Sequence, residues 1–311
     1  MFKRFILISS LFLLATLSVG CSKNSNQESL GGNLKIAATI FPLYDLTRQI
    51  GGEKVDVKLV TEPGASPHTF EATPSLVKDL EGVKVIFSIG HLVDNWAADL
   101  VLDKNKIELF VVDQGIDLKE FNEEDENNKH EAEEEDGENH EHSDVDPHYW
   151  LAPDNAVQIA TNIYKKLSEE DPENKDYYKN NLDDFVQRIE YKNIEWQNKV
   201  DDIENKEIVV FHDAWGYFAD YFGFNIVASF EPFPGKEPTP SYLIDLQADI
   251  NEHNIKAIFV EPQLSKSSLE TLAKDLGVKI GVMDPLGGVS GRQTYVELID
   301  YNINTLSEVL Y

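Results

Sequence analysis

Short apolar runs rich in Val and Ile alternate along the chain with longer amphipathic stretches. In the first half the runs are LKIAAT, VDVKLV, VKVIFSIG and IELFVVD, and in the second half they are EIVVFH, FNIVASF, IKAIFVEP and VKIGVMDP. Strands that alternate with helices form mainly parallel sheets whose faces the helices cover. The pattern therefore predicts two α/β lobes with mainly parallel sheets, over residues 33–173 and 206–311, each with its own core.

Between the two sets of strands lies a segment, residues 174–205, that contains neither Pro nor Gly. Its large apolar residues recur near helical spacing: Tyr178, Leu182, Phe185, Ile189, Ile194 and Trp196. No helix-breaking residue divides the segment, so we expect one long linking helix rather than two shorter ones. A single rigid helix that joins the two lobes is expected to restrict hinge motion between them.

The N-terminal stretch MFKRFILISSLFLLATLSVGC places basic residues ahead of an apolar run and small residues ahead of Cys21. This order is typical of a signal peptide, here residues 1–20, because the apolar run is too short for a membrane span. Cys21 is the only cysteine, and its position resembles that of the acylated cysteine of bacterial lipoproteins. We expect residues 21–32 to be a lipidated, flexible tether. The alternative is an ordinary secretory signal.

The chain is strongly acidic, with 56 Asp and Glu against 27 Lys and Arg and a formal net charge of −29. Such a charge repels phosphate backbones, which argues against nucleic acid as a partner and favours cations. Much of the charge lies in residues 120–145, which have too little apolar content to fold and are predicted to form a disordered loop. The loop contains three histidines: His130, His140 and His142.

Three other histidines follow a strand or lie in a Pro-flanked loop, namely His68, His148 and His212. Asp284 follows the strand VKIGVM. The carboxyl ends of strands face the ligand crevice in open α/β sheets, so these side chains can converge between the lobes. Three neutral imidazoles and one carboxylate suit tetrahedral Zn²⁺, whereas Mn²⁺ prefers more oxygen ligands. Each histidine taken alone is explained more readily by a loop or core position.

Five motifs, in the same order and at compatible separations, resemble those of one protein family. They are SPHTFEATPS, DPHYWLAP, FHDAWGYFADYFG, EPQLSKSSLETLAKDLGVKI and DPLGG. The chain after its N-terminal segment resembles the zinc and manganese solute-binding lipoproteins of ABC importers (metal-binding cluster A-I). The resemblance implies two α/β lobes joined by a rigid helix, with one metal ion held between them.

The resemblance also implies the metal ligands of this chain. They fall on His68 in the Pro-His-Thr-Phe motif, on His148 in Asp-Pro-His and on His212, with Asp284 or a water molecule at the fourth position. Zinc-importing members have His at the third position, whereas manganese-importing members usually have Glu. His212 therefore favours the zinc-specific branch.

Many zinc-specific members carry a His-rich acidic loop just before the second ligand, and the segment 120–145 resembles that loop. Mobile imidazoles among carboxylates bind divalent cations weakly and raise their local concentration, so our hypothesis is that this segment captures zinc near the cleft and hands it over. The alternative is a passive acidic insertion. Three further residues are interpreted without a ligand role: His91 as structural or adjacent to the ligands, His253 as solvent-exposed, and Glu71 as a carboxylate that orients an imidazole.

The resemblance implies a monomer that is lipid-anchored on the outer face of the cytoplasmic membrane or in the periplasm. It would bind Zn²⁺ as a transported ligand and deliver it to a membrane permease whose ATPase drives import, without catalysis. The alternatives are a manganese-binding importer component, a surface adhesin and, with less support, a secreted zinc hydrolase. The sequence contains no His-Glu-x-x-His, no Gly-x-Ser-x-Gly and no Gly-rich phosphate loop, which lowers the support for an enzyme.

Overall fold

The N-terminal lobe is built on a four-stranded parallel sheet. The computed structural model describes residues 33–101, 107–120, 145–231, 240–262 and 273–311. Its first four strands are β1 (Leu34–Ala38), β2 (Val55–Leu59), β3 (Val85–Ser88) and β4 (Glu108–Val111), in the spatial order β2-β1-β3-β4. All three pairings are parallel.

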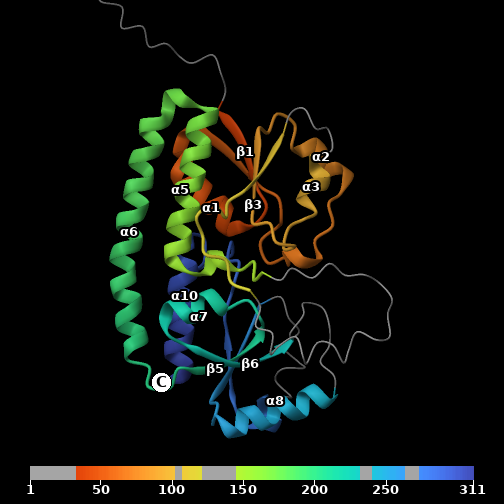
Figure 1. Cartoon of the computed structure of the whole chain (residues 1–311), viewed down its shortest axis with the longest axis vertical. Helices are drawn as coiled ribbons and strands as arrows, with labels where there is room; N and C mark the ends of the chain where they lie inside the picture. The colour runs from red at the N-terminus through yellow and green to blue at the C-terminus, as the bar shows by residue number, and fades with distance from the viewer. Residues whose placement is uncertain (1–32, 102–106, 121–144, 232–239, 263–272) are drawn as a thin grey trace, which may run out of the picture. The chain divides into compact units, whose positions relative to one another are not determined.

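The C-terminal lobe repeats this arrangement. Its strands are β5 (Glu207–His212), β6 (Asn225–Glu231), β7 (Ala257–Val260) and β8 (Lys279–Val282), in the order β6-β5-β7-β8 and again all parallel. The strand order reverses beside β1 in one lobe and beside β5 in the other, and such switch points are where ligands bind in open α/β sheets. The predicted fold class of two parallel α/β lobes is confirmed (Figure 1).

Helices cover both faces of the sheets. The α-helices are α1 (Phe41–Gly51), α2 (Pro74–Asp79), α3 (Ala97–Leu100), α5 (Pro153–Glu170), α6 (Lys175–Asp201), α7 (Gly216–Phe222), α8 (Pro240–Glu252) and α10 (Tyr295–Leu310). Short 3₁₀ helices lie at η1 (Gly52–Lys54), η2 (Pro67–Thr69), η4 (Tyr149–Leu151) and η5 (Pro172–Asn174). Within the described residues, no helix has the length and apolar character that crossing a membrane requires.

The two lobes share a hydrophobic core. In β1, Ile36 and Ala38 belong to one cluster of buried residues and Ala37 to another, because successive strand residues point to opposite faces. In β5, Val210 belongs to the same first cluster as Ile36, and Val209 to a separate one. The first cluster therefore runs through both lobes, whereas the sequence predicted a separate core for each. The reason is that α5, α6, α7 and α10 pack together along the inner faces of both sheets.

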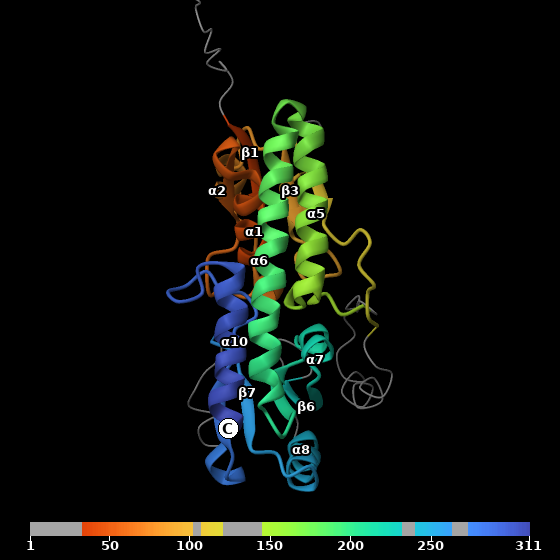
Figure 2. The same cartoon turned by 90° about the vertical axis from the view of Figure 1, so that its left-hand side faces the viewer.

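Helix α6 is the continuous connection between the lobes, as Figure 2 shows. Its 27 residues span about 40 Å at 1.5 Å per residue. Near its start Asn181 donates a hydrogen bond to the carbonyl of Ile50 in α1, and near its end Trp196 donates one to Asp300 in α10. Ile194 was expected on the apolar face, but its side chain is 64% exposed. Its position falls outside the spacing of the buried residues, which places it on the solvent side.

Polar contacts also join the lobes close to α1 and α10. The carboxylate of Asp45 in α1 accepts a hydrogen bond of 2.7 Å from the backbone N–H of Tyr295, the first residue of α10. The hydroxyl of Tyr295 donates to the carbonyl of Trp150, whose indole N–H donates to the carbonyl of Pro285. These buried bonds attach the N-terminal lobe to two separate segments of the C-terminal lobe.

Several predictions concern residues that the structure does not describe. The described residues all belong to the unit Asn33–Tyr311. The predicted signal peptide (residues 1–20), the proposed lipid attachment at Cys21, and the acidic segment with His130, His140 and His142 lie outside the described residues. These assignments stay predictions.

Candidate metal centre

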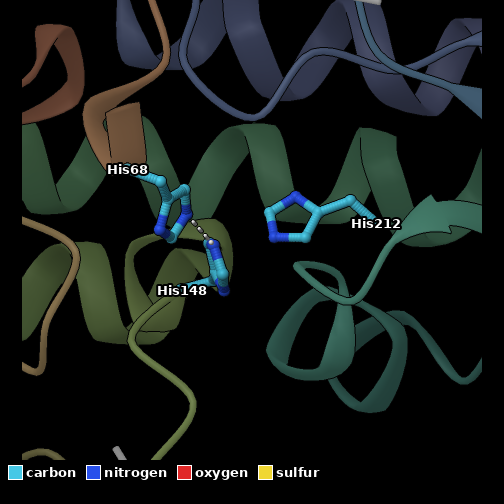
Figure 3. Close-up of side chains that lie close together, drawn as sticks. All are labelled: His68, His148 and His212. Carbon is cyan, nitrogen blue, oxygen red and sulfur yellow. Dashed lines mark hydrogen bonds between the residues drawn. The ribbon is translucent and has the colours of Figure 1, made fainter. Parts of the chain in front are cut away.

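Three histidines from three separate segments meet between the lobes. His68 lies in η2, His148 immediately precedes η4, and His212 is the last residue of β5. One ring nitrogen of each lies within 4.8 Å of the other two, and the three rings face one another (Figure 3). Within the described residues, this is the only group of three or more His, Cys, Asp or Glu side chains close enough to hold a metal ion.

The closest pair in the cluster has the separation that tetrahedral zinc requires. The Nε2 atoms of His68 and His148 are 3.3 Å apart. Zinc binds imidazole nitrogen at about 2.0–2.1 Å, so two such ligands at a tetrahedral angle lie about 3.3–3.4 Å from each other. His148 is only 3% exposed and His212 8%, so a bound ion would be largely shielded from water.

Local structure fixes the backbone of each histidine. The carbonyl of Pro67, next to His68, accepts a hydrogen bond from the indole N–H of Trp96. The backbone N–H of His148 donates to the Asp146 carboxylate at 2.9 Å. His212 stays in the parallel ladder, paired with Glu231. The three histidines are therefore held by a side-chain bond, a tight turn and a strand, respectively.

A carboxylate orients each of the two buried imidazoles. The Nδ1 atom of His148 lies 2.8 Å from Oδ1 of Asp146, and Nδ1 of His212 lies 3.1 Å from Oε1 of Glu261. When each carboxylate holds the proton on Nδ1, the Nε2 lone pair is free to bind metal. Sequence analysis missed both carboxylates, although each is the first residue of a motif: Asp146 begins DPHYWLAP, and Glu261 begins the EP motif after β7.

Burial and neighbouring charges set the protonation of the cluster. Burial, together with the positive charge that His148 and His212 can carry, lowers the pKa of His68 to about 2. Burial also lowers the pKa of His148 well below its ordinary value. At His212 burial alone would lower the pKa, but the adjacent Glu261 carboxylate raises it. These shifts favour neutral His68 and His148, the form in which an imidazole can bind a metal, and leave His212 as the imidazole that more readily carries a proton.

Comparisons with known proteins identify the family. The family described as zinc-uptake complex component A, periplasmic (ZnuA), matches residues 36–309. This chain belongs to that family. It is 29% identical to the high-affinity zinc uptake system protein ZnuA of Bacillus subtilis, over the whole of this chain and 99% of the relative. It is 27% identical to the zinc-binding lipoprotein AdcA of Streptococcus pneumoniae, over 95% of this chain but only 59% of that longer protein.

Solved structures of similar proteins have the same fold. A crystal structure of ZnuA aligns with a TM-score of 0.77 at 25% identity, covering 90% of this chain and all of the other. A mutant of the laminin-binding adhesin Lmb of Streptococcus agalactiae aligns with a TM-score of 0.77 at 26% identity, again over 90% of this chain and all of the other. The parallel two-lobe architecture is therefore that of the family.

Asp284, the predicted fourth ligand, is not part of the cluster of ligand nitrogens. Its Oδ1 atom accepts hydrogen bonds from the backbone N–H groups of Leu286 and Gly287, and its Oδ2 atom lies 3.2 Å from Nε of Arg292. Oδ1 of this buried carboxylate therefore has two backbone partners, whereas Oδ2 has the Arg292 guanidinium beside it as an ion pair without a hydrogen bond from Nε. The role of Asp284 as a ligand stays a prediction.

The remaining histidines and Glu71 lie outside the cluster. Nε2 of His91 lies 2.9 Å from Oδ2 of Asp113, and the His91 ring packs edge-on against that of Tyr149, the residue after His148. His91 therefore has a structural role next to the cluster. His253 lies 3.2 Å from Glu207 in a half-exposed pair. Glu71 is exposed, and the carboxylates that contact ligand imidazoles are others, so the orienting role suggested for Glu71 finds no contact among the described residues.

Proposed function

We propose that this protein binds Zn²⁺ between its two lobes outside the cytoplasm and delivers it to the permease of an ABC importer. The observation that carries the proposal is the three-imidazole cluster, with two Nε2 atoms 3.3 Å apart. Membership of the zinc-uptake family supports zinc as the transported ion. The ion is cargo, and the protein carries out no catalysis.

The arrangement of the site suits capture and release of an ion. The carboxylates of Asp146 and Glu261 preorganise two imidazoles, which reduces the entropy lost when zinc binds. Helix α6 contacts both lobes along its length, so binding is expected to involve local adjustment of ligand loops rather than wide lobe closure. A lipid anchor at Cys21 would keep the protein at the membrane beside its permease, as the name of the AdcA lipoprotein supports.

Competitive metal titration tests this function. We expect one tight zinc site per chain and much weaker manganese binding, because three nitrogen ligands favour zinc over a metal that prefers oxygen. The measurement is competition with a chelator of known affinity, with bound metal counted by mass spectrometry. A chain that binds no zinc tightly, or prefers manganese, would overturn the proposal.

The same titration decides the fourth ligand. Turning the Asp284 carboxylate toward the ion would break the hydrogen bonds of Oδ1 with Leu286 and Gly287 and separate Oδ2 from Arg292. We therefore expect Asp284→Asn to lower the zinc affinity by less than about tenfold, an effect typical of a group outside the metal's own ligands. A loss as large as that caused by replacing a ligand histidine would instead make Asp284 the fourth ligand.

A surface adhesin is a second candidate. It is favoured by the fold match to the laminin-binding adhesin Lmb. Saturable binding to immobilised laminin that persists after zinc is removed would support an adhesive role, and its absence at micromolar protein would exclude it.

A further inference from the structure

One hydroxyl of the C-terminal lobe reaches across to the N-terminal lobe beside the metal centre. Tyr217 lies in α7, five residues after His212, and its side chain is buried. Its hydroxyl oxygen accepts a 2.7 Å hydrogen bond from the backbone N–H of Lys119 and donates to the carbonyl of Asp146 at 3.2 Å. Burial raises the pKa of Tyr217 to about 12, so the hydroxyl keeps the proton that it donates.

The two residues that Tyr217 contacts are already paired with each other. The backbone N–H of Asp146 donates to the carbonyl of Lys119 at 2.8 Å, and the next residues, Glu120 and Val145, form an antiparallel bridge. We call this isolated bridge, formed by residues 119–120 and 145–146, the ladder, and Tyr217 binds both of its segments. The ladder is attached to the C-terminal lobe by this hydroxyl, and by the ammonium of Lys119, which lies over the Tyr217 ring and pairs with Asp220.

The same ladder ends at a ligand of the metal centre. The carboxylate of Asp146 accepts the backbone N–H of His148 at 2.9 Å and lies 2.8 Å from its ring Nδ1. The start of α7 also packs against this carboxylate, since a Cβ placed on Gly216 would lie 3.1 Å from Oδ2 of Asp146. A continuous path of hydrogen bonds thus runs from Tyr217 through Asp146 to the imidazole of His148.

We propose that Tyr217 is a positioning residue for the metal centre. Its hydroxyl holds the backbone of Asp146, and Asp146 holds the ring of His148 in place opposite His212 on the other lobe. The inference rests on the proposed function, because it assigns His148 to zinc. It adds a component outside the ligands and their carboxylates: a cross-lobe hydrogen bond that determines how long zinc stays bound.

The test compares Tyr217→Phe with the matched variant Tyr221→Phe. Tyr221 lies in the same helix and is partly buried, but its hydroxyl forms no hydrogen bond with the described residues. Each variant loses one hydroxyl from α7 and keeps its ring. Two properties are measured in each protein: the ¹⁵N NMR signals of the His148 ring without metal, and the rate at which a chelator removes zinc.

We expect Tyr217→Phe to release zinc about tenfold faster than wild type, because two hydrogen bonds at the ladder are lost. The N–H of half-buried Lys119 and the carbonyl of buried Asp146 both lose their bond to the Tyr217 hydroxyl. The ring signals of His148 should broaden or shift, while Tyr221→Phe resembles wild type in both measurements. Unchanged ring signals in Tyr217→Phe would overturn the inference, as would an unchanged release rate. If the wild type binds no zinc tightly, the proposed function fails, and the metal-free ring signals alone still decide whether Tyr217 positions His148.

Discussion

Replacing His148 with Ala is expected to lower the zinc affinity by roughly a hundredfold to a thousandfold. The apparent free energy of binding structural zinc is about 10–16 kcal/mol for four ligands, or about 2.5–4 kcal/mol for each. Since 1.4 kcal/mol corresponds to a factor of ten, the loss of one ligand gives this range. The loss of affinity for His148→Ala should lie at the upper end of this range, because the Nε2 atom of His148 already lies 3.3 Å from that of His68.

The surroundings of His148 increase the effect. Burial raises the pKa of Asp146, whose carboxyl contacts the His148 ring, to about 7. Without the imidazole this carboxyl loses its ring partner inside a buried site, so it favours the neutral form and contributes less negative charge near the ion. A water molecule that fills the space of the ring cannot restore that pair.

The measurement is chelator competition on wild type, His148→Ala and the control His253→Ala. His253 also contacts a carboxylate, Glu207, but lies in a half-exposed pair away from the cluster. The control should bind zinc as wild type does. A His148→Ala protein that keeps its affinity within a factor of three while remaining folded would remove His148 from the site.

Replacing Trp150 with Ala is expected to lower the free energy of unfolding by about 3–5 kcal/mol, the usual cost of truncating a buried aromatic side chain to Ala. Trp150 is 1% exposed and belongs to the core that the two lobes share. Its indole N–H donates to the carbonyl of Pro285 in the other lobe at 2.8 Å. The substitution therefore opens a cavity and leaves a buried carbonyl without its partner.

Urea unfolding, followed by tryptophan fluorescence and circular dichroism, measures this loss. Tyr191→Ala is the control, because Tyr191 is a large aromatic residue of α6 that is 67% exposed; it should change the free energy of unfolding by less than about 0.5 kcal/mol. A Trp150→Ala protein within 1 kcal/mol of wild type would show that the junction between the lobes contributes little to stability.

Much of the fold follows from local pattern. Each of the eight strands lies in a short apolar run, and the absence of Pro and Gly from 174–205 predicts the single helix α6. The exposed Ile194 shows the limit of that approach, because one apolar residue does not reveal which side of a helix faces solvent. The shared core was missed for a similar reason: an alternating pattern shows that a strand face is buried, but not which element buries it.

Of the residues in the candidate site, the sequence likewise predicted some and missed others. His68, His148 and His212 could be predicted because each lies next to a strand end or a proline, and parallel sheets bring such ends together. Asp146 contacts His148 only two residues further along the chain, but its type alone did not distinguish it from the many other carboxylates. Glu261 and Tyr217 act through contacts between segments distant in the chain: 49 residues separate Glu261 from His212, and 71 separate Tyr217 from Asp146. The first contact depends on how neighbouring strands pair, the second on how the two lobes are oriented, and no local pattern specifies either.

The separation of the ligands along the chain determines when zinc can be loaded. His68 and His148 are 80 residues apart in sequence, and His212 belongs to the other lobe, so an unfolded chain must close long loops before it can surround an ion. Tight affinity is thus a property of the native state alone. Zinc at a hundred times its Kd then adds about 2.7 kcal/mol to native stability by mass action. A chain that crosses the membrane unfolded therefore carries no tightly bound zinc and binds the ion only in the compartment where it folds.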